Sequence, residues 1–108
     1  MRNAAGAASG LLKALANPHR LMIICQLLEG RRSVGEMAAF LGIRDSTVSQ
    51  HLALMRRDGL VSTTREGQTI WYAINSPAAK AVLETLFALY CAPAQKSRPA
   101  NKAKRSAR

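Results

Sequence analysis

The strongest constraint on the fold of this chain is a pair of short helical patterns that only three residues separate. A capping box at Ser33-Val-Gly-Glu36 opens the first pattern, and Gly42 ends it. The second pattern starts at Asp45 or Ser46, either of which can cap a helix. Its apolar positions recur at helical spacing at Val48, Leu52 and Met55. The chain must therefore turn sharply between two helices that pack against each other.

The hydrophobic period changes directly after the second of these helices. Gly59 ends the helix, and residues 61–65 and 69–74 are rich in β-branched and aromatic side chains. The intervening Glu66-Gly67-Gln68 combines a glycine with polar residues, which is typical of a tight hairpin. The sequence therefore predicts a β-hairpin beside the helix pair.

Three further helices flank this unit. The first ends at Asn17-Pro18, because the residue before a proline disfavours the helical conformation, and its apolar positions are Leu11, Leu12 and Leu15. Pro18 suits the first turn of the next helix, which stops at Gly30 and has apolar positions at Leu21, Ile24, Cys25 and Leu28. Ser76-Pro77 starts the last helix, whose apolar positions are Val82, Leu83, Leu86, Phe87 and Tyr90.

These elements predict a mainly α-helical fold with a β-hairpin wing, which is a winged helix-turn-helix. We expect it to occupy a single domain over residues 11–92, preceded by an N-terminal segment at residues 1–10. The first and last helices carry more leucine than so small a core can bury. We therefore expect them to form the interface of a homodimer, whose two-fold symmetry would match that of palindromic DNA sites.

The charge of the chain favours a polyanionic partner. Sixteen Lys and Arg against six Asp and Glu give a formal net charge of +10, so double-stranded DNA is the expected ligand. Six of the basic residues lie within residues 96–108. Residues 93–108 contain two prolines and almost no apolar side chain beyond alanine, so they cannot offset the entropy of folding. We expect a disordered basic tail there, either a solubilising end or an auxiliary phosphate-binding arm.

Nothing in the sequence indicates export or membrane insertion. No apolar run approaches the roughly 18 residues that a membrane span needs. Ala14-Leu15-Ala16 has a faint likeness to a signal-peptide cleavage site, but Lys13 interrupts the stretch before it. We therefore expect a cytoplasmic protein without a membrane partner, in which the two cysteines do not form a structural disulfide.

The helix after the sharp turn has a polar face opposite its apolar stripe. Short hydroxyls allow close approach to phosphates, and a glutamine can pair with adenine in the major groove. The hairpin tip adds one basic and one amide side chain around the flexible Gly67. A solvated helix face and a solubilising hairpin would show the same residues, but together with the turn and the charge they favour DNA contact. The candidate DNA-binding residues are Ser46, Thr47, Ser49, Gln50, Arg56, Arg57, Arg65 and Gln68.

Four sequence blocks over residues 11–91 resemble the successive signatures of ArsR-type winged-helix repressors. The blocks are Leu15-Ala-Asn-Pro-His-Arg-Leu21, Ser46-Thr-Val-Ser-Gln-His-Leu52, Gly59-Leu-Val61 and Arg65-Glu-Gly-Gln-Thr-Ile-Trp-Tyr72. The resemblance implies a homodimer formed by the first and last helices, DNA recognition by the helix after the sharp turn, and release from DNA when an inducer binds.

Many proteins of this family bind a metal inducer, so the available ligands matter. Metal-sensing members often carry a Cys-x-Cys type motif in the helix that corresponds to residues 33–41, which here has no Cys or His. They also carry Asp, His or Glu sets in the last helix, where this chain offers only Glu84. His19 and His51 lie on different helices, and a stable site needs three or four converging donors. The sequence therefore disfavours a metal site and indicates no cofactor.

The two cysteines admit two interpretations. Composition alone favours two small buried hydrophobes, because Cys25 continues an apolar stripe and Cys91 follows Phe87 by four positions. However, one cysteine in the second helix and one at the end of the last, 66 residues apart, look like the BigR/SqrR-type branch of the family. Members of that branch respond to persulfides and related reactive sulfur species. The resemblance thus implies that Cys25 and Cys91 are redox-sensing residues, and that a reactive sulfur or oxidant inducer modifies their thiolates and switches operator affinity.

Three alternatives complete the sequence-based predictions. A metal-responsive ArsR-type repressor would require ligands that the motifs lack. A constitutive architectural DNA-binding protein would have inert cysteines, little sequence preference and a steep salt dependence. An enzyme is not expected, because the chain has no Cys-x-x-Cys, no phosphate-cradling glycine loop and no histidine plainly paired with a cysteine.

Overall fold

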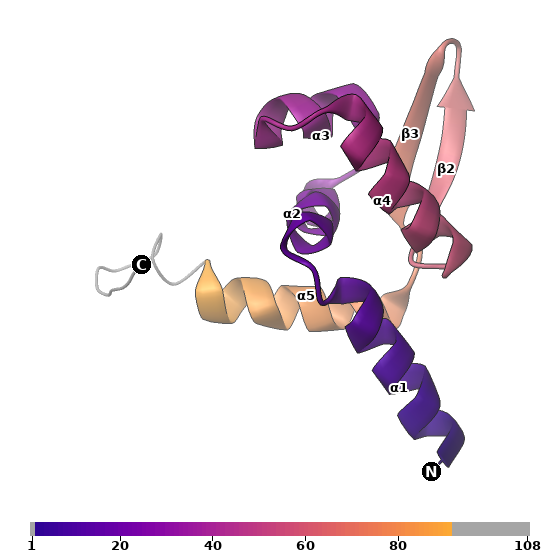
Figure 1. The fold of residues 1–108 in the computed structure, drawn as a ribbon, viewed down its shortest axis with the longest axis vertical. Helices are drawn as coiled ribbons and strands as arrows, with labels where there is room; N and C mark the ends of the chain where they lie inside the picture. The colour runs from indigo at the N-terminus through magenta and orange to yellow at the C-terminus, as the bar shows by residue number, and fades with distance from the viewer. Residues whose placement is uncertain (1, 92–108) are drawn as a thin grey trace.

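The computed structural model describes residues 2–91, and Figure 1 shows how their helices and strands are arranged. The elements are α1 Arg2–Leu15, α2 Pro18–Gln26, the short 3-10 helix η1 Leu27–Glu29, β1 Arg32–Ser33, α3 Val34–Leu41, α4 Asp45–Arg57, β2 Val61–Glu66, β3 Thr69–Ile74 and α5 Pro77–Tyr90. The predicted fold class, mainly α-helical with a hairpin wing, is confirmed. The basic tail expected at residues 93–108 lies outside the described residues.

Side-chain caps start three of the helices. The Asn17 side chain accepts a hydrogen bond from the Arg20 backbone N–H at 3.1 Å, which caps α2. Ser33 and Glu36 form the predicted capping box at the start of α3, at 3.0 and 3.2 Å. The Ser76 hydroxyl caps α5 through the backbone N–H of Ala79 at 3.1 Å. Ser33 and Ser76 thus start their helices as predicted, whereas Asn17 was predicted only to end the helix before α2.

The start of α4 differs from the expectation. We predict Asp45 or Ser46 as its cap, and this prediction is wrong, because the N-cap is Arg44, whose side chain makes no capping hydrogen bond. Asp45 instead lies in the first turn, where its negative charge interacts favourably with the helix dipole. Gly42, at a φ of +71°, has already ended α3 in the left-handed conformation. Only Ile43 and Arg44 remain between the glycine and α4.

The first helix is longer than its apolar stripe. α1 begins at Arg2, so residues 2–10, which we separate from the domain on sequence grounds, continue the helix that contains Leu11. This stretch is rich in alanine, the strongest helix former, so it is helical without an apolar face. Leu15, at the end of α1, is buried in the core.

The three strands form one antiparallel sheet with β3 in the centre, in the order β1-β3-β2. Val61 pairs with Ile74 and Glu66 pairs with Thr69, which leaves Gly67 and Gln68 as the hairpin turn. Glu66 thus belongs to the strand rather than to the turn. The two-residue β1 was not predicted, because Ser33 is both its last residue and the cap of α3. It pairs with β3 and joins the hairpin to the helical core.

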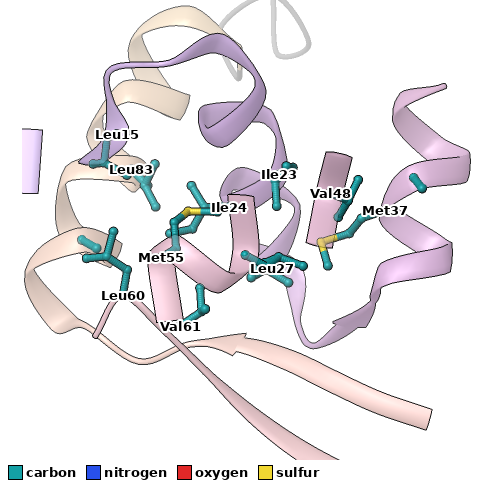
Figure 2. Packing of buried hydrophobic residues seen from close by; sticks show 13 residues of the cluster. Leu15, Ile23, Ile24, Leu27, Met37, Val48, Met55, Leu60, Val61 and Leu83 are labelled. Atoms are coloured by element: carbon teal, nitrogen blue, oxygen red, sulfur yellow. The ribbon is translucent and has the colours of Figure 1, made fainter. Parts of the chain in front are cut away.

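The hydrophobic core lies where the helices meet the base of the sheet, as Figure 2 shows. The predicted stripe of α4 is fully buried in it at Val48, Leu52 and Met55. Met55 lies beside Ile24 of α2 in Figure 2. Truncation of such a side chain to alanine typically costs about 2–5 kcal/mol, so α4 is firmly anchored on its inner side. None of the described helices is long and apolar enough to cross a membrane.

Candidate nucleic-acid interface and cysteine pair

The side of α4 that faces away from the core is polar and accessible. Its exposed candidate residues are Ser46, Ser49, Gln50, Arg56 and Arg57, whereas Thr47 is half-buried. Figure 1 shows the β2–β3 hairpin lying beside α4 and projecting away from α5. The two elements that carry the candidate residues thus lie next to each other. Such an arrangement of helix and wing fits the major groove and the adjacent backbone of DNA.

Both ends of α4 carry basic residues. Arg56 and Arg57 lie in the last turn, where positive charge interacts favourably with the helix dipole. Arg57 approaches Asp58 only to 3.6 Å with both side chains exposed, and such surface pairs contribute little. At the other end, Arg44 is exposed and occupies a cap position that arginine does not favour. Arg44 is not among the residues predicted from the sequence to bind DNA, although a basic residue in the sharp turn is a signal for phosphate contact.

Side chains alternate between the two faces of the hairpin, so the neighbouring Arg65 and Glu66 lie on opposite faces. Arg65 lies on the same face of β2 as the buried Val61, and Glu66 lies on the opposite face. The Arg65 Nε donates a hydrogen bond to the Gly67 carbonyl at 3.2 Å, which holds the guanidinium at the turn. Gln68 is exposed at the tip. The wing residues that we predicted from sequence are therefore both accessible.

Arg31, which is not among the residues predicted from the sequence, contacts the outer face of the wing. The Arg31 guanidinium forms two hydrogen bonds with the Glu66 carboxylate, at 2.7 and 2.9 Å, and lies 4.6 Å from the centre of the Trp71 ring. The hydrogen bonds from Arg31 lower the pKa of Glu66, and the same contact raises the pKa of Arg31. Glu66 therefore stays ionised and paired.

The two histidines, which lie on different helices, are brought together. The rings of His19 and His51 are 5.8 Å apart between centroids, in an edge-to-face arrangement at the contact between α2 and α4. Burial lowers the pKa of His51, and the nearby Arg20 and His19 lower it further. Within residues 2–91, no group of three or more His, Cys, Asp or Glu side chains is placed to hold a metal ion.

Cys25 and Cys91 are both free thiols in different surroundings. Cys25 is half-buried in α2, and Cys91 is exposed directly after α5, where its backbone N–H bonds to the Phe87 carbonyl at 2.8 Å. Burial raises the pKa of Cys25, and the charge of Cys91 raises this pKa further. The two thiols thus differ in access, and they come from the second helix and the end of the last.

Comparison with known proteins identifies the family. The model of the bacterial regulatory proteins of the arsR family matches residues 17–63. The transcriptional activator HlyU of Vibrio cholerae is 52% identical over 81 residues, which are 75% of each chain. The chain belongs to the ArsR family. The structure of reduced HlyU superposes with a TM-score of 0.82 at 48% identity, over 84% of this chain and 96% of HlyU.

Two further proteins extend the comparison of this ArsR-family protein. The biofilm growth-associated repressor of Xylella fastidiosa is 38% identical over 92 residues, 85% of this chain and 81% of the repressor. The crystal structure of the repressor BigR from the same organism has a TM-score of 0.77 at 36% identity, covering 92% and 96% of the two chains. A homodimeric winged helix-turn-helix DNA-binding domain from Mycobacterium bovis has a TM-score of 0.71 at 31% identity, covering 82% and 83%. The ArsR-family protein is therefore a DNA-binding transcriptional regulator, and its resemblance to BigR is confirmed.

Proposed function

We propose that this protein is a sequence-specific repressor whose operator affinity is switched by modification of Cys25 and Cys91. The observation that carries the proposal is the pair of free thiols, with Cys25 half-buried on α2 and Cys91 exposed directly after α5. Cys25 lies on α2, which packs against α4. The cysteine pair is thus one helix away from the helix that would read DNA.

In this proposal, α4 enters the major groove with its polar face toward the base edges. Gln50 pairs with adenine, Ser46 and Ser49 allow close approach, and Thr47 borders the contact. Arg44, Arg56 and Arg57 contact phosphates on either side. At the wing, Arg65 and Gln68 contact the adjacent backbone or minor groove.

The repressor acts as a homodimer joined by α1 and α5. Large apolar side chains remain exposed on these helices, namely Leu12, Leu89 and Tyr90. An open groove of about 970 Å³ also runs along the small residues of α1 and the end of α4, and Leu11, Leu54 and Leu60 are among its lining residues. A second copy would cover these apolar surfaces and place two α4 helices in successive major grooves. The Mycobacterium bovis domain is homodimeric, which supports this assembly.

The two thiols take different roles in the reaction. The Cys91 thiolate, which is accessible, attacks the central sulfur of an organic trisulfide, RSSSR, and one thiolate RS⁻ leaves. The Cys25 thiolate then attacks the inserted sulfur next to the Cys91 Sγ, and the second RS⁻ leaves. The product is a Cys25–S–S–S–Cys91 bridge. The trisulfide is itself the oxidant and is reduced to two thiols, so no other reactant is required.

The inserted sulfur determines which inducers act. A direct disulfide needs Cα atoms within about 7 Å, and each inserted sulfur lengthens the bridge by up to about 2 Å. A pair held beyond the disulfide distance accepts the longer bridge and resists simple oxidation. The bridge joins α2, which supports α4, to α5, which forms the dimer interface. It would therefore change the spacing of the two α4 helices and release the operator.

The test uses a duplex that the wild-type protein selects from a random-sequence pool, with binding measured by fluorescence anisotropy. Treatment with glutathione trisulfide should lower the affinity about 5- to 150-fold, the usual range of allosteric coupling, while Cys25→Ser and Cys91→Ser stay bound. Mass spectrometry should find the bridge with one added sulfur in wild-type protein alone. A wild-type response in either single variant would overturn the two-cysteine mechanism. Release by zinc or arsenite instead would favour a metal-responsive repressor, and failure to select any sequence would favour an architectural protein.

A further inference from the structure

Arg31 ties the wing to the body of the domain. It directly precedes β1, and β1 pairs with β3 through Ser33 and Trp71. From there its side chain crosses the face of β3 over the Trp71 ring and reaches Glu66, the last residue of β2. One side chain therefore spans all three strands, from the edge next to the core to the turn of the hairpin.

The face of the sheet that carries this contact is the outer one. Because side chains alternate along a strand, Trp71 and Glu66 lie on one face of the sheet. Tyr72 and Val61 lie on the other face. Val61 is buried and Tyr72 packs against the core, so their face is directed inward, toward α4. Arg65 belongs to this inward face. The contact among Arg31, Trp71 and Glu66 thus lies on the reverse of the surface from which Arg65 projects.

The hairpin needs such a tie, since its tip extends beyond the core (Figure 1). Two strands alone hold their orientation poorly in water, and the buried residues of β2 are confined to its start at Val61. Both partners of the ion pair are about half exposed, so the pair contributes little to the stability of the whole domain. Its effect is local. The pair joins the end of β2, at the hairpin turn, to the residue that precedes β1.

We propose that Arg31 is a positioning residue for DNA binding, which holds the wing through Glu66 and Trp71 so that Arg65 meets the DNA backbone in register with α4. The inference rests on the wing contact described under the proposed function. Arg31 does not itself touch DNA in this account, and the planar guanidinium is required, because it stacks on the indole and forms two parallel hydrogen bonds at once.

The decisive variant is Glu66→Gln, because charge and positioning predict opposite results. Removal of an acidic group strengthens binding to a polyanion if charge alone matters. If Arg31 positions the wing, Glu66→Gln weakens binding to the selected duplex by about threefold to tenfold. This factor corresponds to the free energy needed to order one or two side chains on binding, which the wild-type protein has already ordered. Arg31→Lys keeps the charge and should weaken binding by the same factor. The matched control is Glu29→Gln, which removes an acidic group from the neighbouring Arg32 ion pair, does not involve Glu66 at the hairpin turn, and should not weaken binding.

Trp71 gives an independent readout, because it is the single tryptophan of the chain. Acrylamide should quench its fluorescence more readily in Arg31→Lys and Glu66→Gln than in Glu29→Gln, with unchanged far-UV circular dichroism. The double variant Arg31→Lys/Glu66→Gln should bind no more weakly than either single variant. Unchanged or tighter binding by Glu66→Gln, or wild-type binding by Arg31→Lys, would overturn the positioning role. Arg65→Gln tests the wing contact separately. If Arg65→Gln loses affinity for the selected duplex and Glu66→Gln does not, only the positioning role is rejected. If Arg65→Gln keeps its affinity, the wing contact itself is rejected.

Discussion

His51 of α4 places its ring edge-to-face against His19 of α2, with 5.8 Å between the ring centroids. The Nδ1 atom of His51 is buried without a hydrogen-bond partner among the described residues. Arg20 lies near enough to lower the pKa of His51 through its charge, and its Nε donates to the Ala14 carbonyl at 2.6 Å. Protonation would therefore place a charged imidazole beside a guanidinium and a second histidine, at the contact that supports α4.

This contact predicts a pH-dependent stability. Because the pKa of His51 is lower in the folded protein than in the unfolded chain, the folded state favours the neutral ring. The contribution of the neutral ring is fully present above the unfolded pKa of about 6.5 and is lost as the pH falls through the lower folded value. Thermal unfolding followed by circular dichroism should show a Tm that declines from pH 7.5 to pH 5.5, roughly the range in which histidine titrates.

The matched variants separate His51 from other groups. His51→Gln should reduce the decline in Tm over the same pH range. His19→Gln should reduce it less, because burial, the largest cause of the lowered pKa, would remain. A decline of wild-type steepness in His51→Gln would assign the pH dependence to another group.

The polar face of α4 predicts which substitutions change sequence preference. Gln50→Ala and Ser49→Ala should each weaken binding to the selected duplex by about 1–3 kcal/mol, because base-edge contacts are lost. Both residues are exposed, so Tm should stay unchanged. The control is Asn75→Ala, a neutral exposed position between β3 and α5, which should bind normally. Equal losses on the selected duplex and on a scrambled duplex would argue against base contacts by these residues.

The basic C-terminal residues predict a different kind of loss. Deletion of residues 96–108 removes six positive charges, so affinity should fall mainly at low salt while sequence preference is kept. Binding to selected and scrambled duplexes, titrated over a range of salt concentrations, measures both quantities. If discrimination between the duplexes disappeared with the tail, recognition would not reside in α4.

The fold could be predicted from the sequence wherever a local signal determines the structure. Ser33 and Glu36 form the capping box because the interaction needs only two side chains three residues apart. The stripe of Val48, Leu52 and Met55 is buried because helical spacing places it on one face. The start of α4 was misplaced, because Asp45 suits both the cap and the first turn, and only the geometry of the sharp turn separates the two positions.

The parts of the site that depend on long-range packing could not be predicted. Arg31 and Glu66 are 35 residues apart, and nothing local indicates that β1 brings them together. The contact between His19 and His51 depends in the same way on the packing of α2 against α4. Cys25 and Cys91 were selected through a family resemblance, because their own surroundings in the sequence are those of ordinary apolar positions.

The surroundings of the two cysteines predict the order in which they react. The thiolate is the nucleophile, and burial and the charge of Cys91 raise the pKa of Cys25. Cys91 is exposed and Cys25 is half-buried, so access favours the same order. Iodoacetamide added to the reduced protein at neutral pH should therefore alkylate Cys91 first, as measured by timed quenching and peptide mass spectrometry. In denaturant the two rates should converge.

The Cys91→Ser variant tests whether the two thiols interact as this order requires. Removal of Cys91 takes away the second cause of the raised pKa and leaves the larger one, burial, in place. The pH profile of Cys25 alkylation should therefore shift modestly to lower pH in Cys91→Ser, with the midpoint still above that of the unfolded chain. An unshifted profile would mean that the thiols do not interact, and faster alkylation of Cys25 in the wild-type protein would exchange the attacking and resolving roles. Both measurements use the reduced protein without inducer, because the order of reaction depends only on burial and charge in that state.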